Sequence, residues 1–162
     1  MSIPYRNTVK RNANFKLDYD RKYIQQNYYL KPTGLWYQIK DCLFLWGELS
    51  WGRDVYEIKL KKNILNKPKG ILSITNKDDL TDFYNRYKLR WYWKDDNYTI
   101  NWEKVSNDYG GFEIKNYNKI IKEIRKEKNY INNYTWFLII DFSSGCVWDL
   151  NLIKEIKYRG KY

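Results

Sequence analysis

Acidic side chains are the groups in this sequence best suited to carry out chemistry, because the chain contains no histidine. That absence excludes Ser-His-Asp triads, Cys-His dyads and zinc sites ligated by histidine. Four acids stand beside aromatic or glycine residues: Glu48, Glu113, Asp141 and Asp149. An enzyme built from this chain must therefore work through carboxylates, substrate positioning and backbone donors.

Asp141 is the most conspicuous of these acids. It follows an apolar run at residues 136–140, which we interpret as a buried strand, and it precedes the turn at residues 143–146. Burial raises the pKa of a carboxyl group unless donors stabilise its charge, and groups perturbed in this way often mark functional sites. The alternative is a carboxylate that bonds the backbone N–H groups of its own turn. Both interpretations are open.

A second candidate site lies around the stretch "TGLWY" at residues 33–37. Gly34 interrupts a strand pattern, which predicts a bulge or a close approach of the backbone to a ligand; plain strand packing is the alternative. Trp36 and Tyr37 are expected on opposite faces of that strand, so one of them is expected in the core. Cys146 has no histidine to activate it, which favours an inert buried thiol over a nucleophile.

Charge and aromatic residues point to a different class of function. The formal net charge is +11, and a field of that sign attracts nucleic acids and other polyanions. The run Arg90-Trp91-Tyr92-Trp93-Lys94 places three rings between two cations and could stack single-stranded bases while pairing phosphates. A hairpin that packs the same rings into the core is the alternative. No RNP motif, KH loop or zinc finger is present.

Composition bounds the fold class. The chain of 162 residues is 43% hydrophobic and 19% aromatic, which excludes a disordered protein. We predict a single α+β domain over residues 31–162, preceded by a basic, Tyr-rich segment at residues 1–30. Its sheet is expected to be split and mainly antiparallel, with about six short strands and three or four helices. Helices are predicted at 41–52, 76–87, 100–111 and 118–130, and strands at 31–40, 54–62, 71–75, 112–117, 135–142 and 146–158.

Cellular setting follows from what the sequence lacks. Two cysteines provide neither a disulfide framework nor, without histidine, a metal site. There is no N-terminal signal sequence and no apolar span of 18 residues. We therefore expect a cytoplasmic protein that binds no metal and does not insert into a membrane.

Three segments together resemble a group of small viral and phage-type proteins. These segments are "KPTGLWY", "INWEKVSNDYGGFEI" and "WFLIIDFSSGCVWD", and the resemblance extends over most of residues 31–149. The shared pattern runs Lys-Pro-x-Gly-Leu-Trp-Tyr, then Asp-Tyr-x-Gly-x-Glu, then Ser-Gly-Cys-x-Trp. The group is similar to proteins with the ADP-ribosyltransferase-like fold, in which a split sheet holds NAD.

The resemblance implies roles for individual residues. Gly34 would offer backbone groups to nicotinamide, and Trp36 or Tyr37 would form a wall of the pocket. A hydroxyl would come from Ser73, Ser143 or Ser144. Glu113, with Asp141 as the second choice, would stabilise the oxocarbenium-like centre that forms as nicotinamide leaves.

Two further hypotheses come from other functional classes. The protein could be a non-catalytic nucleic-acid-binding protein that uses its basic, aromatic surface. It could also be a viral protein that binds and inhibits a host factor. An active ADP-ribosyltransferase would act on NAD and pass ADP-ribose to a protein or nucleic acid, and the basic charge would suit a polyanionic acceptor.

Overall fold

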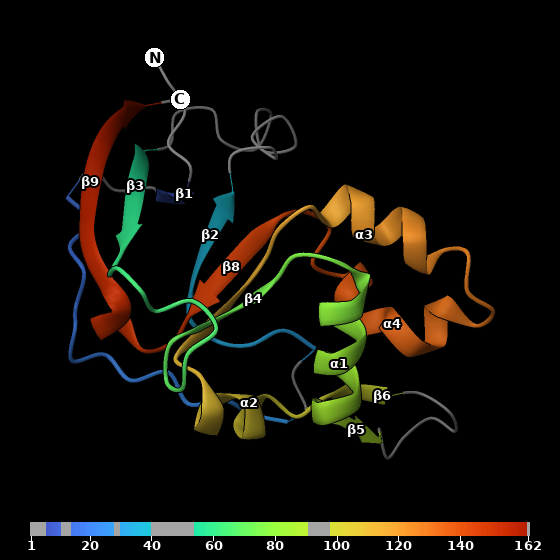
Figure 1. Ribbon diagram of the computed structural model, residues 1–162. Coiled ribbons are helices and arrows are strands. Elements are labelled where there is room, and N and C mark those ends of the chain that lie inside the picture. The colour runs from blue at the N-terminus through green and yellow to red at the C-terminus, as the bar shows by residue number, and fades with distance from the viewer. Residues whose placement is uncertain (1–5, 11–13, 28–29, 40–53, 91–97, 162) are drawn as a thin grey trace.

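The computed structural model describes residues 6–10, 14–27, 30–39, 54–90 and 98–161. These residues form four α-helices, nine strands and a 3-10 helix, so the predicted α+β class is confirmed (Figure 1). The helices are α1 (Lys77–Tyr87), α2 (Trp102–Asp108), α3 (Tyr117–Ile124) and α4 (Tyr130–Leu138), and the 3-10 helix is η2 (Leu150–Leu152). The strands are β1 (Arg6–Lys10), β2 (Leu35–Ile39), β3 (Asp54–Leu60), β4 (Ile71–Ile74), β5 (Lys88–Arg90), β6 (Tyr98–Ile100), β7 (Gly111–Ile114), β8 (Ser144–Val147) and β9 (Ile153–Lys161).

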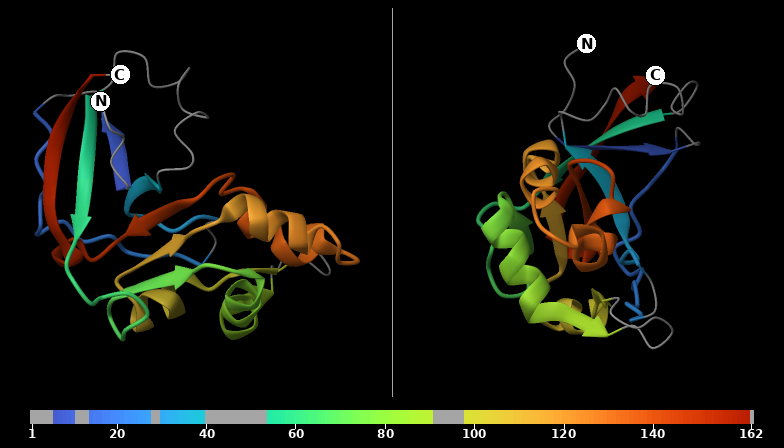
Figure 2. Two further views of the ribbon diagram at one scale, coloured as in Figure 1. Left: turned by 45° about the horizontal axis from the view of Figure 1, so that its top comes forward. Right: turned by 90° about the vertical axis from the view of Figure 1, so that its right-hand side faces the viewer.

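Seven strands form one sheet in the order β4-β7-β8-β2-β1-β3-β9. Only β4 and β7 run parallel, and every other neighbouring pair in this sheet is antiparallel. The sheet is strongly bent: in the left view of Figure 2, β3 and β9 rise steeply from the part that contains β4 and β7. The small β5–β6 ladder stands apart from it. The prediction of a mainly antiparallel sheet is therefore confirmed.

The N-terminal residues contribute more to the fold than the sequence indicated. Strand β1 lies between β2 and β3, where Thr8 pairs with Tyr56 and Arg6 pairs with Ile39. Without β1, no hydrogen bonds would join strands β3 and β9 to the part of the sheet formed by β4, β7, β8 and β2. Strands with few apolar residues are difficult to identify from their pattern, because the neighbours that bury them are distant in sequence.

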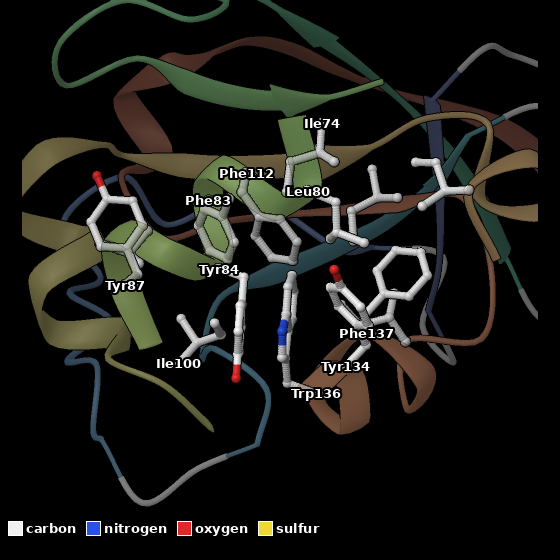
Figure 3. Close-up of a cluster of buried hydrophobic side chains, with 14 of the residues drawn as sticks. Ile74, Leu80, Phe83, Tyr84, Tyr87, Ile100, Phe112, Tyr134, Trp136 and Phe137 are labelled. Carbon is white, nitrogen blue, oxygen red and sulfur yellow. The ribbon is translucent and has the colours of Figure 1, made fainter. Parts of the chain in front are cut away.

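All four helices pack on one face of the bent sheet. Their apolar side chains meet the strand residues Phe112 and Ile114 in a single aromatic-rich core (Figure 3). Trp102 and Trp136 are both 0% exposed in this core, and their rings meet edge to face at 6.1 Å. Such aromatic contacts add to the stabilisation that burial provides. We call this side of the sheet the helix face.

The predicted strand at residues 135–142 is wrong, because residues 135–138 lie in helix α4 and residues 139–140 form the turn that follows it. Helix α4 buries Tyr134, Trp136 and Phe137, and Ile140 is buried just beyond its end. A short apolar run fits a buried helix as well as a buried strand, so its pattern alone does not distinguish them. Asp141 follows the helix in an exposed turn with a φ of 69°. It is not the buried carboxylate that a strand would have produced.

The opposite side of the sheet, here called the inner face, holds a second and smaller core. Its buried residues are Leu35, Tyr37, Ile39, Ile58, Ile71, Val147, Leu150 and Ile153. Phe15 and Leu17, from the segment that follows β1, pack against this core. The inner face also carries the charged cluster described next.

Candidate functional site

Glu113 is the centre of a buried polar cluster on the inner face. It lies in the middle of β7, between Phe112 and Ile114, whose side chains point to the helix face. Side chains alternate along a strand, so Glu113 points the other way. Its side chain is 0% exposed. A carboxylate at such a position must be compensated by donors and opposite charge.

One row of paired residues crosses four strands at this point. Ser73 of β4 pairs with Glu113, Glu113 pairs with Gly145 of β8, and Gly145 pairs with Tyr37 of β2. Residues directly opposite in a ladder share a face, so all of these side chains meet on the inner face. The Ser73 hydroxyl lies 3.3 Å from Oε1 of Glu113, and the Tyr37 hydroxyl donates to Oε2 at 3.0 Å.

Gly145 makes the contact between Tyr37 and Glu113 possible. A Cβ atom at this position would lie 2.3 Å from Cζ and 2.4 Å from the hydroxyl oxygen of Tyr37. The ring of Tyr37 therefore passes directly over the backbone of β8 on its way to Glu113. Any residue larger than glycine would push the ring off this path. Glycine is required in the "SSGC" turn pattern because the Tyr37 side chain of the neighbouring strand β2 crosses this position.

Two cations complete the cluster. Arg6 donates from Nε to Oε2 at 3.0 Å and from Nη2 to Oε1 at 3.1 Å, and Nζ of Lys115 lies 2.9 Å from Oε1. The Arg6 and Lys115 side chains are 16% and 23% exposed, so they form the boundary between the carboxylate and solvent. Among the described residues, these two positive charges surround the single negative charge of Glu113.

The electrostatics of the cluster fix the protonation of its members. Burial disfavours the charge of Arg6 and lowers its pKa, but the interactions with Glu113 and Tyr37 together outweigh that effect and the net shift is upward. Burial, and then the negative charge of Glu113, raise the pKa of the Tyr37 phenol well above its usual value. Arg6 is therefore a permanent cation and Tyr37 a neutral donor at physiological pH.

The remaining candidates named from the sequence do not touch Glu113. Trp36 faces the helices, where its ring meets Phe112 edge to face at 5.9 Å. Gly34 packs against β8, since a Cβ there would lie 2.6 Å from Sγ of Cys146. Ser144 is buried and donates to the carbonyl of Phe142, on the face opposite Glu113. The close approach predicted at Gly34 is thus an approach to a neighbouring strand.

Other candidates have structural contacts or lie elsewhere. The Ser143 hydroxyl accepts the N–H of Tyr117 at the start of α3. Burial raises the pKa of Cys146 well above its ordinary value, which favours the inert thiol. Asp149 accepts the N–H of Asn151 at the start of η2. Arg90 ends β5 and is exposed, whereas Trp91, Tyr92, Trp93, Lys94, Glu48 and the predicted helix at 41–52 lie outside the described residues.

Sequence reasoning missed Arg6 and Lys115. Lys115 follows Glu113 by two residues, a spacing that places both on one face of a strand, and this signal was available. Arg6 gave no comparable signal, because it is separated from Glu113 by 107 residues and lies in a segment that was placed ahead of the domain.

No known family model, curated protein or solved structure is significantly similar to this chain. No helix among the described residues is long and apolar enough to cross a membrane. The same part of the chain contains no group of three Cys, Asp or Glu side chains placed to hold a metal ion. The chemistry of the Glu113 cluster is therefore the basis for a functional proposal.

Proposed function

We propose that the protein binds NAD or a related nucleotide and transfers ADP-ribose, with Glu113 as the essential carboxylate. The observation that supports this function is the convergence of Ser73, Tyr37 and Glu113 on one point of the inner face. The resemblance to ADP-ribosyltransferase-like proteins singles out these three residues separately, as hydroxyl, pocket wall and acid.

The proposed reaction breaks the bond between the ribose C1′ atom and the nicotinamide nitrogen. Nicotinamide leaves with the bonding electron pair, and positive charge develops on the ribose ring. A fixed carboxylate at this point stabilises the oxocarbenium-like transition state, as it does in glycosidases. An acceptor nucleophile then bonds to C1′ and loses its proton to solvent. Glu113 supplies the charge, and the Ser73 and Tyr37 hydroxyls orient its two oxygens.

Arg6 and Lys115 give the substrate a way to reach Glu113. Both cations bind the carboxylate, and both are the partly exposed members of the cluster. Arginine and lysine also bind phosphate well. We propose that the pyrophosphate of the dinucleotide competes for these two side chains and opens the carboxylate to the ribose.

The first test is thermal unfolding of the protein with and without millimolar NAD. A ligand that binds only the folded state adds ~2.7 kcal/mol of stability at a hundredfold excess over its dissociation constant. Release of nicotinamide is then compared between the wild type and Glu113→Gln. We expect Glu113→Gln to lose turnover and about 2 kcal/mol of stability, because Arg6 and Lys115 can turn toward solvent.

The matched control is Glu155→Gln, which removes an exposed carboxylate that pairs with Lys59 on the β3–β9 ladder. This variant should bind and cleave NAD like the wild type. Absence of a thermal shift with both NAD and ADP-ribose would contradict the proposal. Unchanged turnover in a folded Glu113→Gln protein would contradict it as well.

A further inference from the structure

A basic depression lies at the start of β2, away from the Glu113 cluster. It is an open hollow of about 610 Å³ between the coil around residues 21–24 and the chain that enters β2. Its lining residues are Arg21, Lys22, Tyr23, Ile24, Pro32, Thr33, Gly34 and Trp36. Trp36 and Tyr37 are neighbours on β2 with opposite faces, so this basic depression and the Glu113 cluster lie on different sides of the sheet.

The two walls of the basic depression are held together by a side-chain amide. Gln25 is only 6% exposed; its Nε2 donates to the Thr33 carbonyl at 2.7 Å and its Oε1 accepts the Thr33 N–H at 2.9 Å. The Thr33 hydroxyl donates a hydrogen bond to the Ile24 carbonyl at 2.9 Å. Trp36 is fixed in the same way, because its indole N–H donates to the Pro32 carbonyl at 3.2 Å. The hollow is therefore formed before any ligand arrives.

The lining combines aromatic rings with cations. The guanidinium of Arg21 lies 4.8 Å from the ring centre of Tyr23, and the Lys31 ammonium at the rim lies 6.0 Å from the ring of Trp36. Arg21, Lys22 and Lys31 are exposed, and none forms an ion pair with a described residue. No acidic side chain among the described residues lines the hollow. Asp18 and Asp20 lie in the turn just before Arg21, but neither forms an ion pair with these three cations.

We propose that the basic depression binds single-stranded nucleic acid. Bases stack on Tyr23 and Trp36, and the flanking phosphates pair with Arg21, Lys22 and Lys31. Fixed rings with cations over them are suited to this ligand, because every base offers a π-face and every linkage a negative charge. An acidic peptide would satisfy the cations but leave the rings without partners. This inference is independent of NAD chemistry at Glu113.

The test measures binding of a fluorescein-labelled 12-nucleotide single strand by anisotropy over a series of salt concentrations. The triple variant Arg21→Gln/Lys22→Gln/Lys31→Gln removes three exposed charges. Its logarithmic salt slope should be smaller by about 2, since each phosphate contact with a single strand contributes about 0.7. The matched control is Lys119→Gln/Lys122→Gln/Lys126→Gln, with the same charge change on and just after α3. Helix α3 begins beside Ser143, near the far end of β2.

A 12-residue abasic strand separates stacking from charge without any change in the protein. It carries the same phosphates, and it should bind at least about tenfold more weakly, because two stacked bases each contribute roughly fivefold or more. Glu113→Gln should bind the normal strand like the wild type, so failure of the NAD proposal leaves this one intact. Three results would overturn the inference: equal weakening by both triple variants, equal affinity for the abasic strand, or tighter binding of a polyglutamate peptide. A wild-type protein that binds no strand at 50 mM salt would overturn it as well.

Discussion

Phe112 and Glu113 are neighbours on one strand and belong to two different kinds of interior. Phe112 meets the rings of Trp36, Trp102 and Trp148 on the helix face, and it is 0% exposed. Glu113 is equally buried but meets two cations and two hydroxyl groups on the inner face. Both positions exclude water, but the surroundings of Phe112 are aromatic rings, whereas those of Glu113 are charged groups and hydroxyls.

The contrast indicates what each face is for. An aromatic core is stabilising in proportion to its buried area and tolerates exchange of one large apolar residue for another of similar volume. A buried ion pair is weak evidence for stability, because well-packed apolar residues in its place are often as stable or more so. Stability alone therefore explains the helix face, whereas the Glu113 cluster calls for an additional role such as the one proposed.

Removing the Phe112 side chain should cause the largest loss of unfolding free energy among the variants that compare the two faces. Phe112→Ala leaves a cavity among three tryptophans, and truncations of this kind cost about 3–5 kcal/mol. The free energy of unfolding, measured with urea, should fall further than it does in Glu113→Gln. A smaller loss in Phe112→Ala than in Glu113→Gln would mean that the inner face, not the aromatic core, holds β7 in place.

The sequence was informative where one face of an element is apolar over its whole length. The stretch at residues 76–87 gave α1 correctly, since Leu80, Phe83, Tyr84 and Tyr87 recur at helical spacing and Asn76 accepts the N–H of Asp79 as a cap. The resemblance and its place after two glycines also single out Glu113, which the structure places in a buried polar cluster.

The rest depended on contacts between distant parts of the chain. Arg6 reaches Glu113 across three strand spacings of about 4.8 Å each, and the bend of the sheet shortens that distance. The reason for Gly145 lies in the path of the Tyr37 side chain, from another strand. Local patterns contain no information about either feature. The apolar run of α4 was misread because neighbours that are remote in sequence decide whether such a run becomes helix or strand.

Gly145→Ala should show how closely the inner face is packed. The new methyl group overlaps the Tyr37 ring, so the ring must move and its bond to Glu113 is lost. We expect a loss of about 2–3 kcal/mol from overpacking and the missing hydrogen bond together. Urea unfolding of Gly145→Ala, Tyr37→Leu and the double variant forms a cycle that isolates their interaction. The double variant should lose less unfolding free energy than the two single variants lose in sum. Strict additivity would show that Tyr37 does not lie over Gly145.

Tyr37→Phe should give the smallest loss at neutral pH and the clearest pH signature. At pH 7 the variant lacks one hydrogen bond to a charged group, which costs about 1.5 kcal/mol. Burial, followed by the charge of Glu113, raises the pKa of Tyr37 well above its usual value. The folded state therefore keeps a proton that the unfolded state releases near pH 10. The stabilisation is complete below pH 10 and declines above it by about 1.4 kcal/mol for each pH unit.

Tyr117 on the helix face provides the control for this titration. Burial, and then the charge of Asp141, raise the pKa of Tyr117 to about 12, so Tyr117→Phe should also flatten the alkaline loss of stability, but only up to that pH. Tyr37→Phe should flatten it over the whole accessible range, because its pKa is shifted further. Unfolding free energies of the wild type and both variants between pH 9 and pH 11 test this: the slope should flatten in both variants, which are expected to diverge only above about pH 12. An unchanged alkaline slope in Tyr37→Phe would mean that the phenol ionises freely and does not donate to Glu113, and the inner face would then lose the property that distinguishes it from the helix face.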